Sequence, residues 1–267
     1  MAATAPRPLA ELHQPGRLDG ILCDIDDTLT HHGRLVPGML SMLKRAQDAG
    51  LKVIPVTGRP GGWVDHIARM WPVDGVVGEN GGLWFWMGGG RLERRFLQSA
   101  DERTANRVRL SSLADQILKA VPGTALASDQ PYRELDLAID FCEDVPPLDE
   151  AAVEEIVRCF EAAGATCKVS SIHVNGWFGA FDKLAGIRAL HRDRWGTEID
   201  TERWAFFGDS ANDEPMFAAF PLSVGVANVR HFLPRMDTGP RWITEAEGGH
   251  GFVEAMDLLL RRGVAPG

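Results

Sequence analysis

Two acidic residues follow the first apolar run of the chain. Ile21-Leu22-Cys23 has the composition of a buried strand, and Asp24 and Asp26 come directly after it. Because they are two residues apart in a tight loop, both carboxylates can reach the same ligand. Such a pair suits either a hard-cation site or a nucleophile with a neighbouring acid. The residues alone leave the choice between these two chemistries open.

Two further polar clusters carry groups that suit an anion. Thr57 and Gly58 follow another apolar run, and a glycine there lets a backbone N–H approach an oxyanion closely. Lys183 stands at the start of a predicted helix, where its ammonium and the free N–H groups of the first turn both favour negative charge. These residues are therefore candidates for binding an anionic group.

A fourth cluster again follows an apolar run. It begins with Gly208 and contains Asp209, Asn212 and Asp213. Asp213 heads a predicted short helix, where it suits an N-cap position without being excluded from a catalytic role. Two acids four residues apart, preceded by a glycine, can complete the hard-cation site that the first cluster suggests.

The elements between these clusters predict how they come together. Short apolar runs alternate with amphipathic stretches, which is the signature of βα units around a parallel sheet. We expect strands at 21–23, 51–56, 73–77, 204–207 and 222–226, and helices at 39–49, 63–70, 182–194, 213–219 and 251–262. In a Rossmann-like α/β sheet of this kind, ligands bind outside the carboxyl ends of the strands. All four clusters should therefore face one crevice.

The βα rhythm is interrupted in the middle of the chain. A hairpin is predicted at 83–87 and 91–97, and strands then occur between helices at 102–120 and 149–163. We interpret 83–180 as an inserted α+β cap domain, 18–82 with 181–267 as the core domain, and 1–17 as a flexible N-terminus.

Composition narrows the classes of function. The 267 residues are 45% hydrophobic, which is enough for a packed core in two lobes, and the formal net charge is −9. That charge argues against a nucleic-acid partner, whose phosphates bind clustered Lys and Arg. The four cysteines form no CxxC pair, and no apolar run approaches the roughly 20 residues of a membrane span. We expect a soluble, cytoplasmic protein with no membrane partner.

In this order the four clusters resemble the motifs of the haloacid dehalogenase superfamily. These are an Asp-x-Asp-x-Thr run at Asp24, a Thr-Gly-Arg turn at Thr57, the lysine at 183, and Gly-Asp-x-x-Asn-Asp from Gly208. The insert resembles the cap of subfamily IIB, which the Cof-type, sucrose-phosphatase-like, mannosyl-3-phosphoglycerate phosphatase and phosphomannomutase branches share. Asn80-Gly81 and the run from Gly225 to Asn228 resemble the Cof-type pattern.

The resemblance implies a Mg²⁺-dependent phosphatase that forms an aspartyl-phosphate. Asp24 is then the nucleophile, and Asp26 is first the acid for the leaving oxygen and later the base for water. The phosphoryl group would be bound by Thr57, Gly58, Lys183 and Asn212. Mg²⁺ would be held by Asp24, the backbone carbonyl of Asp26, and Asp209, while Asp213 supports Lys183 or the coordination shell of the metal.

Substrate selection would fall to the cap. His173 and Asn175 are two apart on a predicted strand, so they share a face and offer donors to sugar hydroxyls. Arg133 is a further candidate. We therefore expect a small phosphorylated substrate, such as a sugar phosphate, and a monomer or homodimer.

Two other functions remain open from the sequence. A phosphomannomutase-like phosphosugar mutase would use the same motifs, with cap arginines for a second phosphate. A non-catalytic binding protein on the same fold would need none of the four motifs intact.

Overall fold

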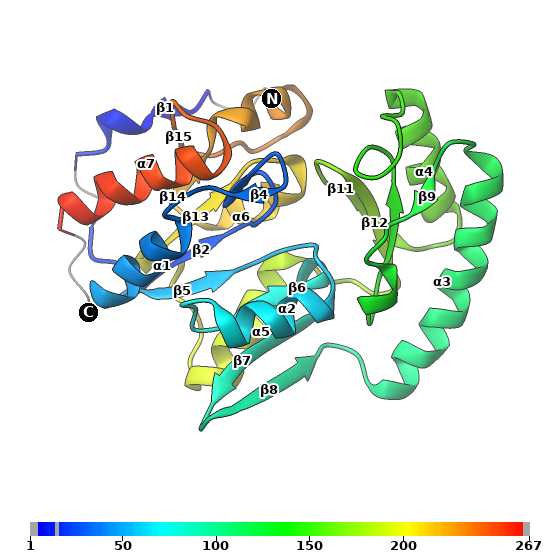
Figure 1. Ribbon diagram of the computed structural model, residues 1–267, viewed down its shortest axis with the longest axis horizontal. Coiled ribbons are helices and arrows are strands. Elements are labelled where there is room, and N and C mark those ends of the chain that lie inside the picture. The colour runs from blue at the N-terminus through cyan, green and yellow to red at the C-terminus, as the bar shows by residue number, and fades with distance from the viewer. Residues whose placement is uncertain (1–4, 14–15, 264–267) are drawn as a thin grey trace.

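The computed structural model describes residues 5–13 and 16–263, and its larger lobe contains a parallel six-stranded sheet (Figure 1). The strands run in the order β1-β15-β14-β13-β2-β5, and every pairing between neighbours is parallel. Their bounds are Arg7–Pro8, Trp242–Ile243, Leu222–Gly225, Trp204–Gly208, Gly20–Cys23 and Lys52–Pro55. The predicted Rossmann-like α/β core is confirmed.

Helices cover both faces of this sheet because the side chains of each strand alternate between the faces. Ile21 and Phe207 pack with helices on one face, whereas Leu22 and Phe206 pack with helices on the other. The first face carries α1 (Met39–Asp48), α2 (Gly61–Met70) and α7 (Gly248–Arg261). The second carries α5 (Lys183–Trp195) and α6 (Glu214–Ala219). Both faces are therefore buried, which explains the continuous apolar runs of the central strands.

An antiparallel sheet of β6 (Val76–Gly78), β7 (Leu83–Gly88) and β8 (Arg91–Phe96) extends the larger lobe. Phe85 packs in the same cluster as residues of α2, and Trp84 in the same cluster as residues of α5. The β7–β8 hairpin thus packs on the core, although it lies inside the predicted insert of 83–180. We propose that the cap proper begins after this hairpin, at α3.

The smaller lobe is an antiparallel sheet with helices α3 (Ala100–Ala120) and α4 (Glu150–Ala162) (Figure 1). Its strands run in the order β11-β12-β10-β9, with bounds Thr166–Val169, His173–Trp177, Leu137–Asp140 and Ala125–Leu126. Leu113, Ile139 and Phe160 belong to a hydrophobic cluster of this lobe alone. This is the inserted α+β cap that the sequence predicts.

The N-terminal segment corrects one expectation for residues 7–12. The sequence predicts that 1–17 is flexible, but Arg7–Pro8 pairs with β15 as the edge strand, and Leu9 and Leu12 are buried in the core. Burial of these leucines anchors the segment, while residues 1–4 and 14–15 lie outside the described residues. No helix of the described chain is long and apolar enough to cross a membrane.

Candidate active site

Asp24 and Lys183 meet at the carboxyl end of the central strands. Asp24 follows β2 and is 5% exposed, and Lys183 begins α5 and is 2% exposed. Lys183 Nζ donates to Asp24 Oδ1 and to Asp213 Oδ1, each at 2.7 Å. Asp182 caps the helix by accepting from the N–H of Ala185, which fixes where α5 begins and so where its lysine points.

The fourth cluster forms a tight loop after β13. Asp213 Oδ2 accepts from the N–H of Asp209 at 3.0 Å, so the loop folds back on its own carboxylate. A Cβ at Gly208 would lie 2.4 Å from that same oxygen, which only glycine avoids. Asn228 Nδ2 donates to Asp209 Oδ2 at 3.1 Å and holds this second acid in the crevice.

The three acids lie so close together that their negative charges repel one another. Ligand oxygens of Asp24, Asp209 and Asp213 lie within 4.8 Å of one another, and all three residues are buried. Burial raises the pKa of Asp24 to about 8, with Asp213 and Asp26 adding to the rise and Lys183 opposing it. Burial and the charge of Asp24 likewise raise the pKa of Asp209 well above its ordinary value. Because three carboxylates face one ammonium, a hard cation bound to these oxygens would relieve the repulsion.

Asp26 pairs with a second cation, Arg59. Arg59 Nε lies 3.0 Å from both carboxylate oxygens of Asp26, and Arg59 Nη2 lies 2.9 Å from Oδ1. The guanidinium therefore grips the carboxylate from two of its nitrogens. Arg59 was part of the Thr-Gly-Arg turn in the sequence, but nothing in that pattern assigned it a partner.

The remaining phosphate-site candidates lie beside these groups. Thr57 is fully buried, and its Oγ1 accepts from the N–H of Arg59 at 3.0 Å. Gly58 and Asn212 line a cavity of about 20 Å³ that Asp24 and Asp26 also line. The structure thus brings the predicted core residues to one place, and their individual roles stay predictions.

The three cap candidates line the same small cavity. Arg133 Nη1 donates to the carbonyl of Gly58 at 2.9 Å and so joins the cap to the core. Asn175 Nδ2 donates to Asp136 Oδ2 at 3.1 Å, and His173 Nε2 lies 2.9 Å from Glu143 Oε2. Their contact with a substrate stays a prediction, but each one faces the crevice.

Four acidic residues around the crevice were not predicted to belong to it. Asp129 and Asp136 bind Arg133, while Glu143 binds Arg59 at 2.7 Å. Glu79 is fully buried, and its carboxylate accepts from the N–H groups of Gly61 and of residues 134–136. No local pattern signals the roles of Glu79 and Glu143, because their partners lie at least 18 residues away along the chain. Asp129 and Asp136 are within four residues of Arg133, but that spacing does not place them at the crevice.

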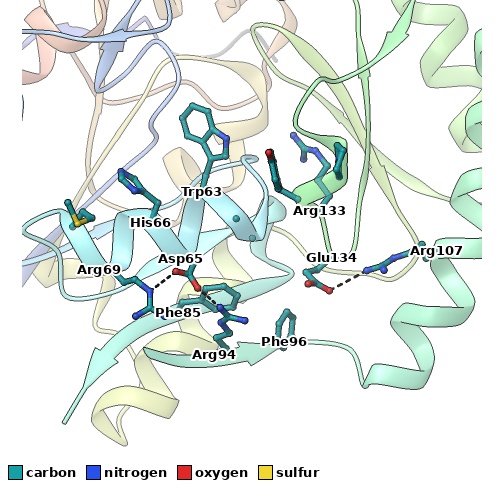
Figure 2. Close-up of a pocket in the computed structure, with 15 residues that line it drawn as sticks. Trp63, Asp65, His66, Arg69, Phe85, Arg94, Phe96, Arg107, Arg133 and Glu134 are labelled. Atoms are coloured by element: carbon teal, nitrogen blue, oxygen red, sulfur yellow. Dashed lines mark hydrogen bonds and ion pairs between the residues drawn. The ribbon is translucent and has the colours of Figure 1, made fainter. Parts of the chain in front are cut away.

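A much larger cavity, of about 970 Å³, lies between α2, the hairpin and the cap (Figure 2). It shares only Arg133 with the lining of the small cavity. Figure 2 shows that its charged side chains pair with one another: Asp65 with Arg69 and Arg94, and Glu134 with Arg107. The motif residues are absent from its lining, so the small cavity is the candidate active site.

The fold and these motif side chains define a hydrolase of the haloacid dehalogenase type. A family model for haloacid dehalogenase-like hydrolases matches residues 21–99. The phosphoglycolate phosphatase of Pyrobaculum neutrophilum is 30% identical over 247 residues, covering 91% of this chain and 96% of the relative. That of Methanobrevibacter smithii is 25% identical over 259 residues, covering 91% and 99%. The chain belongs to the haloacid dehalogenase-like hydrolases, and these relatives are phosphatases.

Solved structures share the whole fold. Thermoplasma acidophilum 0175 superposes with a TM-score of 0.70 at 18% identity, covering 93% of this chain and 100% of that chain. The sucrose-phosphatase of Synechocystis sp. PCC6803, solved with sucrose and phosphate, has a TM-score of 0.64 at 15% identity, covering 91% and 98%. At these identities the similarity shows only that the fold is shared, in the core and in the cap.

Proposed function

We propose that this hydrolase is a Mg²⁺-dependent phosphatase that removes the phosphoryl group of a small phosphate monoester through an aspartyl-phosphate on Asp24. The observation that carries the proposal is the buried Asp24 beside Lys183, at 2.7 Å, in the same cavity as Asp26 and the cap residues. A nucleophile, a cation and an acid–base group are thus within one crevice.

The acidic cluster fits a magnesium ion. Its oxygen donors, from Asp24, Asp209 and Asp213, are the ligand type that Mg²⁺ prefers, and their mutual repulsion favours a bound cation. We propose Asp24, Asp209 and the backbone carbonyl of Asp26 as ligands, with Asp213 holding Lys183. When bound, Mg²⁺ would supply positive charge that reduces the repulsion between the phosphoryl oxygens and the attacking carboxylate.

The chain's own residues then account for two balanced steps. In the first, a carboxylate oxygen of Asp24 attacks phosphorus, the bond from phosphorus to the leaving oxygen breaks, and Asp26 gives that oxygen its proton. In the second, a water attacks the same phosphorus, the bond to Asp24 breaks, and Asp26 takes the proton of the water. Thr57, Gly58, Lys183 and Asn212 would bind the transferring phosphoryl oxygens in both steps.

The cap side of the cavity favours a leaving group that carries hydroxyls, as in a sugar phosphate. Both guanidiniums that line the cavity already face carboxylates: Arg59 of the core faces Asp26 and Glu143, and Arg133 of the cap faces Asp129 and Asp136. Neutral hydroxyls can exchange hydrogen bonds with such paired groups and with His173 and Asn175 without requiring a free cation.

Phosphoglycolate is the second candidate substrate, because the P. neutrophilum and M. smithii relatives both carry that activity in their names. Its carboxylate would need a cation, and both arginines among the described residues that line the cavity are already paired, so one of them would have to be freed. The mutase alternative is less well supported. Arg133 is the only cap arginine among the residues that line the small cavity, and it is already paired.

The test is release of inorganic phosphate from a panel of sugar phosphates, phosphoglycerate-linked sugars, nucleotides and 2-phosphoglycolate, with Mg²⁺ or with EDTA. Release that requires both Mg²⁺ and Asp24 would support the phosphatase and rank the two substrate classes. Absence of release across the panel, together with isomerisation of a phosphosugar, would replace the phosphatase with a mutase.

A further inference from the structure

Arg59 contacts both the candidate acid–base group and the cap. It follows the Thr-Gly turn of the core and is 6% exposed. On one side it grips Asp26, and on the other Nη2 donates to Glu143 Oε1 at 2.7 Å and Nη1 lies 3.3 Å from Asp129 Oδ2. Asp129 and Glu143 belong to the cap. All three nitrogens of the guanidinium thus have carboxylate partners from two lobes.

The surroundings of Arg59 hold it in this position. Its guanidinium lies 4.6 Å from the ring centre of Trp63 on α2, which restricts the plane in which the fork can lie (Figure 2 shows this tryptophan). Burial opposes ionisation of Glu143, but hydrogen bonds from His173 and Arg59 outweigh it and lower the pKa of this carboxyl to about 2. Glu143 is therefore a fixed negative charge on the cap over the whole neutral range.

We propose that Arg59, held by Glu143 when the cap closes, is a positioning residue that orients the Asp26 carboxylate for hydrolysis of the aspartyl-phosphate. This inference rests on the proposed function. Arg59 donates to both carboxylate oxygens of Asp26, whereas the cation that contacts Asp24 is Lys183, so Arg59 acts through Asp26.

Two features favour a role of Arg59 in the second step: the volume of the cavity and the charge of Asp26 in that step. The cavity that Asp24 and Asp26 line has about 20 Å³, which is too little for a sugar or another leaving group to remain bound there. Of the two proposed steps, only the second takes place without the leaving group in the site. In that step Asp26 is a carboxylate that must take a proton from water, and a carboxylate is what the guanidinium fork binds.

The structure also explains why a lysine could not replace Arg59. The guanidinium is a rigid planar fork that reaches Asp26 through Nε and Nη2 and the cap through Nη1 and Nη2. A lysine has one nitrogen on a flexible stem, so it can satisfy one carboxylate but cannot orient two at once.

The first experiment is a double-mutant cycle between Arg59 and Asp26. We expect Arg59→Gln and Arg59→Lys each to lower the rate of phosphate release by at least about tenfold, within the range of an acid–base contribution. In an Asp26→Asn background, Arg59→Gln should lower the residual rate by less than about twofold, because contacting residues that act as a unit are not additive. An equal loss in both backgrounds would overturn the proposal and make Arg59 a structural residue.

The second experiment separates the two steps by rapid mixing with p-nitrophenyl phosphate and acid quench of the phosphoenzyme. In Arg59→Gln we expect the decay of the phosphoenzyme to slow by at least about tenfold, while its formation changes by less than about threefold. Glu143→Gln, which keeps the shape of the cap contact, should slow the same step by a smaller factor. Slower formation with unchanged decay would contradict the proposal.

Arg69→Gln is the matched control, since Arg69 lies on α2, pairs with Asp65 and has a side chain that is 48% exposed. Both rates should equal those of the wild type. If no phosphoenzyme forms in the wild type, the proposed function itself fails. If phosphoenzyme forms and decays equally fast in wild type and Arg59→Gln, only the positioning role fails.

Discussion

Two clusters of charge meet at the crevice, and they are built differently. The first, around Lys183, joins Asp24 and Asp213, and all its members come from the core. The second, around Arg59, joins Asp26 of the core to Asp129 and Glu143 of the cap. The side chains of the first cluster are at most 7% exposed, whereas those of Asp26 and Glu143 are 19% and 28% exposed.

This difference indicates that the two clusters depend differently on the cap. The lysine cluster is built only from strand and helix ends of the core, so its ion pairs do not depend on the cap. The arginine cluster depends on the position of the cap, because two of its acids, Asp129 and Glu143, belong to the other lobe. In the proposed function, the core would therefore carry the nucleophile Asp24, and the position of the cap would decide whether Asp26 is held in place.

The largest effect should come from the lysine cluster. We expect Asp24→Asn to lower phosphate release by about four orders of magnitude or more, because the nucleophile is lost. The amide has nearly the same shape, so the circular dichroism spectrum should stay unchanged. A variant with near-normal turnover would remove Asp24 from the role of nucleophile.

Lys183 should be important for stability as well as for activity. Lys183→Met leaves Asp24 and Asp213 buried without their cation, and breaking such a buried pair costs about 3–5 kcal/mol. Urea unfolding would measure this loss. The control is Lys44→Met in an exposed pair on α1, which should change the free energy of unfolding by less than about 1 kcal/mol.

Mg²⁺ should raise the melting temperature, and more at pH 8 than at pH 6. Burial raises the pKa of Asp24 to about 8, so between its ordinary value and 8 the folded chain binds more protons at this group than the unfolded chain. The contribution of Asp24 to stability therefore falls as the pH rises through that window. A bound cation relieves the repulsion that causes the fall.

Thermal unfolding of the wild type and of Asp209→Asn, with Mg²⁺ or EDTA at both pH values, would measure this effect. The Mg²⁺-dependent rise should be small or absent in Asp209→Asn. An equal rise in that variant would show that the ion binds elsewhere.

The smallest effect should come from the exposed ion pairs of the large cavity in Figure 2. Arg107 pairs with Glu134, and their side chains are 64% and 41% exposed. Arg107→Gln should change the free energy of unfolding by about 0 to 1 kcal/mol and leave phosphate release unchanged. A tenfold loss of activity would instead connect this cavity to the reaction.

The sequence predicted the core through local signals. The strand at Gly20–Cys23 and the helix at Lys183–Trp195 differ from their predicted bounds by a single residue at each end, or less. Apolar runs and helix-capping residues are local patterns of a few residues, so they can be recognised in the sequence. The rule that ligands bind at strand ends then predicts that the four motifs lie close together. By contrast, Trp242–Ile243 was missed as a strand, since a two-residue pairing leaves too short a pattern to recognise.

What the sequence determined by itself is the order of the four motifs along the chain, because three of them follow a visible apolar run and Lys183 begins a predicted helix. Only the tertiary structure decided which partner Arg59 takes. Asp26, Asp129 and Glu143 are 33, 70 and 84 residues away from it along the chain. A pairing over such distances has no local sequence pattern, such as a hydrophobic period or a capping residue, that would predict it. It forms only when the cap domain folds back over the ends of the strands.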